Sequence, residues 1–270
     1  MWKSFLITTA LLCTGGTIFA QKPTALYLGD SCSLSGFGQT VEATLRRDGV
    51  EVFAVVDRGA GPYHWLKEYQ QFQSDAEYWE KTGTNERHVF SVRTVPKIDG
   101  LLREANPTVV VVQAGTSLYG ILRSKRRNPE ANLLEVRNLV ELMAREITAS
   151  GARLYWILPP HTHERLHPAE LQNRLATIIK SIVESNGGRV FDSKRVTRYS
   201  APYPVNDGIT YTEEQSTDWA RQVCPDLLNF IGGDRPGYRQ PFTPLTKIET
   251  TNAIPVSLTP LTEVTTPASR

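Results

Sequence analysis

A serine at the end of an apolar run is the first residue of this chain whose type and position could do chemistry. Gly29-Asp30-Ser31 follows the run Thr24 to Leu28 and precedes a stretch with helical spacing. A hydroxyl group at the start of a helix lies near backbone N–H groups that favour a developing negative charge. A serine there can also simply cap the helix. Ser31 is therefore a candidate nucleophile, with a structural role as the alternative.

Three further segments follow Gly29-Asp30-Ser31 along the chain. They are Arg58-Gly59-Ala60-Gly61, Ala114-Gly115-Thr116-Ser117 and Asn206-Asp207-Gly208-Ile209-Thr210. In this order the four segments resemble the GDSL (SGNH) hydrolase family, and the resemblance extends from about residue 24 to 231. It implies that Ser31 attacks an ester carbonyl and that the backbone N–H of Gly59 or Gly61 helps to form the oxyanion hole. It also implies an oxyanion donor at the position of Ser117 and an acid block at Asp207.

Two positions depart from the family pattern. Ser117 stands where the family has an asparagine, and Thr210 stands where it has the histidine base. A serine hydroxyl can still donate one hydrogen bond, but losing an oxyanion donor typically costs ~2.7–4 kcal/mol of transition-state stabilisation. A threonine hydroxyl cannot act as a base near neutral pH. The block at Asp207 therefore lacks the histidine that would accept the proton of Ser31.

Three histidines could replace the missing base, because each follows a predicted strand or the glycine turn. They are His64, His161 and His163, and each can equally be a loop histidine with ordinary hydrogen bonds. His161 and His163 could also form half of a metal site, but no third ligand stands at a recognisable spacing. We therefore predict neither a metal nor another cofactor.

Apolar runs alternate with segments of helical spacing, which predicts an α/β protein with a doubly wound parallel five-stranded sheet. This three-layer α/β/α arrangement is the flavodoxin-like fold that the resemblance implies. Ligands of such sheets bind at the carboxyl ends of the strands, so we expect the four segments to meet there. The predicted strands are 24–28, 50–56, 108–113, 153–158 and 190–192, and the predicted helices are 38–48, 63–72, 95–105, 129–150, 168–185 and 213–231.

Residues 73–94 are polar and aromatic without a clear period, which predicts an insertion over one end of the fold. Aromatic residues are frequent in and beside it, and such residues either fill a core or form platforms for sugar rings. They are Tyr63, Trp65, Tyr69, Phe72, Tyr78 and Trp79, with Tyr119 after the third segment.

The two ends of the chain differ from the predicted domain of residues 21–233. Residues 1–20 have the basic start, apolar run and small-residue site of a secretory signal peptide, with a retained anchor as the alternative. We therefore expect an exported protein of the periplasm or the extracellular space, with no transmembrane span after signal removal. Residues 234–270 are rich in Thr and Pro, which is typical of a disordered tail or a spacer.

The net charge of +2, from 30 basic and 28 acidic residues, favours neither nucleic acid nor an anionic membrane as partner. The basic run 123–127 is either a solvated loop or a contact for an anionic substrate. Cys32 and Cys224 are either joined in a disulfide or two separate buried thiols, because sequence alone does not show whether they meet.

Two functions are compatible with these residues. The first is an exported ester hydrolase of SGNH type that acts through a serine nucleophile on a small-molecule ester or an acylated carbohydrate. The second is a degenerate relative that binds a glycan or another ligand in the same cleft without turnover. The retained Ser31 favours the first function, and the replacements at Ser117 and Thr210 favour the second.

Overall fold

The computed structural model describes residues 22–69, 73–74, 76–201 and 203–233 of the 270-residue chain. The predicted signal peptide and the predicted Thr/Pro-rich tail lie outside these residues. Within the described part of the chain, no helix is both long enough and apolar enough to cross a membrane.

Five parallel strands form the centre of the sheet, as the alternating pattern predicts. In spatial order they are β2 (Glu51–Asp57), β1 (Thr24–Gly29), β7 (Val109–Gln113), β8 (Arg153–Ile157) and β9 (Arg189–Phe191). The chain turns outward in opposite directions from β1 and β7, so the switch point of the sheet lies between them. This is where a doubly wound sheet places its ligand.

The sheet has seven strands rather than the predicted five, because a hairpin continues it beyond β2. β4 (Tyr78–Thr82) pairs antiparallel with β2, and β5 (Asn85–Val89) pairs antiparallel with β4. The insertion predicted for residues 73–94 is therefore present, but its β4–β5 hairpin lengthens the edge of the sheet instead of covering one end of the fold. The hairpin lacks a clear period because β4 buries only its first two side chains, whereas β5 is a polar edge strand. Two short strands, β3 (Gln73–Ser74) and β6 (Arg93–Thr94), pair at its base.

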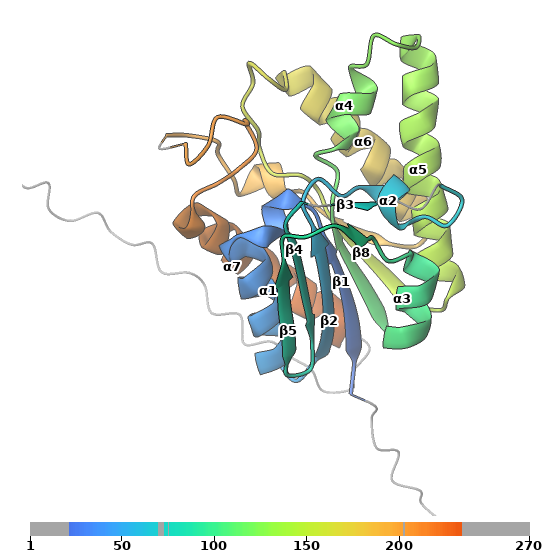
Figure 1. Ribbon diagram of the computed structural model, residues 1–270, viewed down its shortest axis with the longest axis vertical. Coiled ribbons are helices and arrows are strands. Elements are labelled where there is room, and N and C mark those ends of the chain that lie inside the picture. The colour runs from blue at the N-terminus through green and yellow to red at the C-terminus, as the bar shows by residue number, and fades with distance from the viewer. Residues whose placement is uncertain (1–21, 70–72, 75, 202, 234–270) are drawn as a thin grey trace, which may run out of the picture. The chain divides into compact units, whose positions relative to one another are not determined.

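Helices cover both faces of the sheet and complete the three-layer arrangement (Figure 1). α1 (Gly36–Arg47) and α7 (Glu213–Gly232) pack together on one face, where Phe37 stacks on Trp219 with ring centroids 3.7 Å apart. α3 (Ile98–Ala105), α5 (Pro129–Ala149) and α6 (Ala169–Ser185) cover the other face. Successive residues of β1 point to opposite faces, so Tyr27 enters one core and Leu28 the other.

Helix ends follow from local chemistry, and two helices differ from the prediction. α5 begins at Pro129 after Asn128, whose side chain caps the Ala131 N–H, and it ends before Gly151 at a φ of +87°. The predicted helix over 63–72 is shorter: α2 spans only Pro62–Trp65, and residues 70–72 lie outside the described chain. A further short helix, α4 (Leu118–Leu122), follows Ser117 and was not predicted.

Candidate active site

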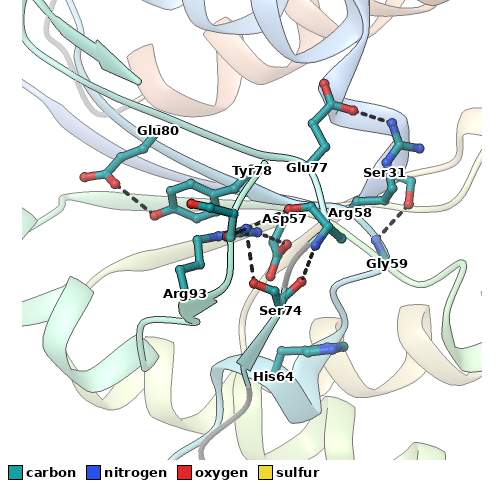
Figure 2. A network of polar contacts seen from close by, with 12 residues as sticks. Ser31, Asp57, Arg58, Gly59, His64, Ser74, Glu77, Tyr78, Glu80 and Arg93 are labelled. Atoms are coloured by element: carbon teal, nitrogen blue, oxygen red, sulfur yellow. Dashed lines mark hydrogen bonds and ion pairs between the residues drawn. The ribbon is translucent and has the colours of Figure 1, made fainter. Parts of the chain in front are cut away.

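The structure brings Ser31 and Gly59 together. Ser31 is half-buried and begins a short 3-10 helix, η1 (Ser31–Leu34), immediately after β1. The Gly59 N–H donates a hydrogen bond to Ser31 Oγ at 2.8 Å, as Figure 2 shows. Among the described residues, this is the one hydrogen bond that the Ser31 hydroxyl group makes. The candidate nucleophile therefore lies directly beside a predicted oxyanion donor.

A tight turn presents the Gly59 N–H to the serine. The Ala60 N–H donates to the Asp57 carbonyl at 3.0 Å, and Gly59 has a φ of +76°. A positive φ at the third residue of a turn is unfavourable for residues with a Cβ, so glycine is the residue that this turn accepts most readily. The turn follows β2, and its neighbour β1 leads into Ser31, so the parallel register of the two strands places both groups at one edge.

Asp30 connects the nucleophile segment to the third segment. Its carboxylate is fully buried and accepts hydrogen bonds from Cys32 N at 3.0 Å, Thr116 N at 3.3 Å and Thr116 Oγ1 at 2.8 Å. Burial raises the pKa of Asp30, while these hydrogen bonds act in the opposite direction. Asp30 thus holds the two turns together beneath Ser31, and its charge is not exposed to a substrate.

Gly61 and Ser117, the other two predicted oxyanion donors, lie against each other. A Cβ added to Gly61 would come within 2.3 Å of Ser117 Oγ, so glycine is needed for this close approach. However, the Gly61 N–H donates to His64 Nδ1 at 2.9 Å, and the Ser117 hydroxyl donates to the Ala60 carbonyl at 3.4 Å. Both donors are therefore directed to neighbours rather than to Ser31.

The fourth segment reaches the same edge of the sheet, because Cys32 Sγ lies 3.9 Å from the Ile209 carbonyl oxygen. Asp207 is exposed, and its carboxylate accepts the Ile209 and Thr210 N–H groups, each at 2.9 Å. The Thr210 hydroxyl donates to the same carboxylate at 2.5 Å. Thr210, which stands where the resemblance implies a histidine, therefore bonds to the predicted acid residue Asp207.

Two of the three histidines considered as replacement bases, His163 and His64, accept a backbone N–H at Nδ1. His163 lies beside the fourth segment, since its N–H donates to the Gly208 carbonyl at 2.8 Å, but its Nδ1 accepts the Arg165 N–H at 3.1 Å. A neutral ring that accepts at Nδ1 carries its proton on Nε2, and a protonated nitrogen cannot accept the proton of a serine. His161 Nε2 lies 3.5 Å from the Glu164 carboxylate, and its Nδ1 is buried.

His64 has the same arrangement as His163, since its Nδ1 accepts the Gly61 N–H. Burial lowers the pKa of His64 to about 4. Within the described chain, no histidine forms a hydrogen bond with Ser31. These arrangements do not favour any of the three as the base, and that assignment stays a prediction.

Most of the aromatic residues that suggested a sugar platform belong to the core. Trp65, Tyr78, Trp79 and Tyr119 are buried, while Phe72 lies outside the described residues. These aromatic side chains fill the protein core, because helices cover both faces of the sheet.

Different tyrosines line the fourth segment. Tyr199 stacks on Tyr203 with ring centroids 5.0 Å apart, and Tyr203 is 44% exposed. Burial and then the Asp207 carboxylate raise the pKa of Tyr199, which places its phenol near that turn. Sequence spacing alone did not reveal these residues, since the loop that carries them has no period.

The two cysteines of the described chain are separate buried thiols. Burial, followed by the nearby Asp30 carboxylate, raises the pKa of the Cys32 thiol, so the thiol beside Ser31 stays protonated and is a poor nucleophile. No cluster of three His, Cys, Asp or Glu side chains suited to a metal ion occurs among the described residues.

A buried ion pair near the glycine turn was missed by the sequence analysis. Asp57, the last residue of β2, bonds to Arg93 from the insertion (Figure 2). The only sequence signal was the place of Asp57 at the carboxyl end of a strand, because the two residues are 36 positions apart.

No protein-family model matches the chain, and no curated protein matches it. Solved structures do match. LAE5, described as an alpha/beta hydrolase enzyme from the metagenome of Lake Arreo, Spain, is 9% identical with a TM-score of 0.53, covering 80% of this chain and 97% of its own. TesA is 16% identical with a TM-score of 0.50, covering 76% and 97%. The acetyl xylan esterase AlAXEase is 11% identical with a TM-score of 0.49, covering 76% and 99%.

At these identities the likeness concerns the fold. The parallel sheet with helices on both faces agrees with the fold that the chain shares with LAE5 and TesA. The chain has an SGNH hydrolase-like fold.

Proposed function

We propose that this protein is an ester hydrolase of the SGNH type with Ser31 as its nucleophile. Ser31 Oγ attacks the acyl carbon, the C–O bond of the ester breaks, and the alcohol leaves with the proton that the Ser31 hydroxyl gives up. Water then attacks the acyl-serine, which releases the acid and returns a proton to Ser31 Oγ. The Gly59 N–H donates to the oxygen that becomes negative during attack. The observation that carries the proposal is the 2.8 Å contact between Gly59 N and Ser31 Oγ, which joins nucleophile and donor at one point.

The substrate we propose is a small acyl ester. An acylated carbohydrate is the narrower form of this proposal. Its support is the pair Tyr199 and Tyr203 near Asp207, where an exposed ring could stack on a sugar. The leader-like pattern of residues 1–20 supports export to the periplasm or the extracellular space.

A second function, ligand binding without turnover, is favoured by one specific observation. The Thr210 hydroxyl is bonded to Asp207, and the ring nitrogens of the nearby histidine, His163, are not arranged to accept the Ser31 proton. A site of this kind would retain the Gly59 donor and bind an oxyanion or carbonyl group while leaving the ester intact.

One experiment separates the two functions. The purified protein is incubated with p-nitrophenyl acetate and, separately, with a fluorophosphonate probe between pH 6 and 9. We expect turnover and labelling in the wild type and in Ser35→Ala, a serine of the same loop that bonds to the Cys32 carbonyl. Both should be lost in Ser31→Ala. Absence of turnover and labelling in the folded wild type would contradict the hydrolase and leave ligand binding.

A further inference from the structure

The glycine turn beside Ser31 is held from outside by the insertion. The two residues that precede Gly59, Asp57 and Arg58, each form an ion pair with a residue of the insertion. Figure 2 shows both ion pairs and the Gly59 to Ser31 hydrogen bond in one view. Because Gly59 has no side chain, its position depends on how its neighbours are fixed.

The first ion pair is buried. The Asp57 side chain is 1% exposed, and the Arg93 side chain that contacts it is 12% exposed. Arg93 Nη1 also donates to the Ala76 carbonyl at 2.7 Å, and its guanidinium carbon lies 4.3 Å from the centroid of the Tyr78 ring. A buried carboxylate without an ion-pair partner is strongly unfavourable. Burial raises the pKa of Asp57, and the Arg93 guanidinium opposes this rise more than the Ser74 hydroxyl or the Arg58 N–H does, so Arg93 is the main contact that favours the ionised carboxylate.

Arg93 has little freedom to move away from Asp57. Tyr78, the ring against the guanidinium, is directly opposite Asp57 in the pairing of β4 with β2. Arg93 itself is paired with Ser74 in the short β3 and β6 ladder. The guanidinium group is thus fixed by a cation–π contact and by two sets of strand pairing.

The second ion pair holds the next residue. The Arg58 N–H donates to the Glu77 carbonyl at 2.9 Å, and the Arg58 guanidinium bonds to the Glu77 carboxylate. The peptide plane between Arg58 and Gly59 carries the N–H that faces Ser31. Contacts on Asp57 and Arg58 therefore fix the direction in which that N–H points.

We propose that Arg93 is a positioning residue for the oxyanion donor of this site, acting through Asp57 to aim the Gly59 N–H at Ser31. The inference rests on the proposed esterase function for its catalytic consequence. It makes the insertion part of the machinery of the site, although no residue of the insertion forms a hydrogen bond with Ser31 in the described chain. A displaced donor lowers transition-state stabilisation without changing how the substrate first binds.

The test uses four variants. Arg93→Met removes the charge and leaves Asp57 without its ion-pair partner, and Arg93→Lys restores a cation. The double variant Asp57→Asn/Arg93→Met removes both charges, which relieves the burial cost while still lacking the ion pair. Arg87→Met is the matched control, because Arg87 forms an exposed ion pair with Glu80 on the same hairpin. Its guanidinium carbon lies 6.0 Å from the centroid of the Tyr78 ring, farther than the 4.3 Å of Arg93.

We expect kcat for p-nitrophenyl acetate to fall about 10- to 100-fold in Arg93→Met, with KM changed less than about twofold. Arg93→Lys should recover part of the loss. The double variant should regain thermal stability but keep a low kcat, and Arg87→Met should match the wild type. Recovery of kcat together with stability in the double variant would show a structural role alone and overturn the proposal.

A second readout does not depend on activity. Exchange of the Gly59 amide hydrogen, followed by NMR, should become about tenfold faster in Arg93→Met and in the double variant, but not in Arg87→Met. If the wild type proves inactive while Gly59 exchange still responds to Arg93, the proposed function fails and the positioning stands. Unchanged Gly59 exchange in a folded Arg93→Met protein would overturn the positioning itself.

Discussion

Asp30 and Asp207 accept the same kinds of hydrogen bond from different donors, and they have different roles in the fold. Each carboxylate accepts two backbone N–H groups and one threonine hydroxyl. Asp30 is fully buried, and its partners Cys32 and Thr116 belong to two segments that are distant in sequence. Asp207 is exposed, and its partners lie within three residues. One carboxylate joins two parts of the fold, whereas the other closes only its own turn.

This contrast extends to the two halves of the site. The half with Ser31 and Gly59 is built from contacts between strands and across the insertion, so its geometry follows from the fold. The half with Asp207 and Thr210 is a local turn that can exchange a side chain without disturbing the sheet. A change of side chain at position 210 should therefore leave Ser31 and Gly59 in place.

The largest effect we expect comes from rebuilding the second half. Thr210→His should raise kcat/KM for p-nitrophenyl acetate about 10²- to 10⁴-fold, the usual gain from a positioned general base. Asp207 is already placed to accept a side-chain N–H from this position. The gain should vanish in Thr210→His/Ser31→Ala. A folded Thr210→His protein without any gain would show that a histidine at position 210 is not placed to accept the proton of Ser31.

The next effect contrasts the two carboxylates directly. Asp30→Ala should lower the free energy of unfolding by about 2–4 kcal/mol, because it leaves buried N–H and hydroxyl donors without an acceptor. Asp207→Ala should cost less than about 1 kcal/mol, since water can replace the carboxylate at an exposed turn. Urea denaturation of both variants measures the difference. Equal losses would contradict the distinction drawn between them.

The free energy of unfolding should depend on pH through His64, which bonds to the glycine turn in the half of the site that contains Ser31 and Gly59. Its ring is kept neutral in the folded protein by a pKa lowered to about 4, whereas the unfolded chain binds a proton below about pH 6.5. The free energy of unfolding should therefore fall as pH decreases from about 6.5 to about 4, by on the order of 1 kcal/mol at pH 5.5.

His64→Asn provides the control for this pH effect. Asn Oδ1 can take the place of Nδ1 as acceptor of the Gly61 N–H, and asparagine does not titrate. The difference in stability between wild type and variant should shrink as the pH is lowered from 7 to 5. A difference independent of pH would mean that His64 is not kept neutral by burial.

The smallest effect should come from Ser117. Its hydroxyl donates to the Ala60 carbonyl rather than toward Ser31, so Ser117→Ala should change kcat less than about threefold. Steady-state kinetics on the ester measure it. A loss comparable to that of an oxyanion donor, 10²-fold or more, would show that the hydroxyl turns to the substrate during reaction.

The parallel core and the meeting of the Ser31 segment with the glycine turn at one edge could be predicted from sequence for the same physical reason, whereas the choice between Gly59 and Gly61 stayed open. Apolar runs such as Val109–Gln113 are buried on both faces, and the carboxyl ends of adjacent parallel strands must share one edge. The hairpin beyond β2 was missed because β5 is exposed along most of its length and has no apolar period. Gly83, with a φ of +58°, was its one turn signal.

Contacts between residues that are far apart in the sequence could not be predicted from the sequence. Asp57 meets Arg93 only because an antiparallel hairpin returns the chain to β2, and Asp30 meets Thr116 only because β1 and β7 are neighbours. The engagement of the Gly61 N–H by His64 was also not predicted, although the two residues are three positions apart. A short helix after a proline brings them together, and that helix was expected to be longer.

The most direct test is the crystal structure of the protein after reaction with a small alkyl fluorophosphonate. The adduct mimics the tetrahedral acyl-transfer intermediate, with the phosphoryl oxygen in the place of the oxyanion. We expect phosphorus bonded to Ser31 Oγ and its free oxygen about 2.7–3.1 Å from the Gly59 nitrogen. An adduct on another residue, or a phosphoryl oxygen turned away from Gly59, would contradict the account.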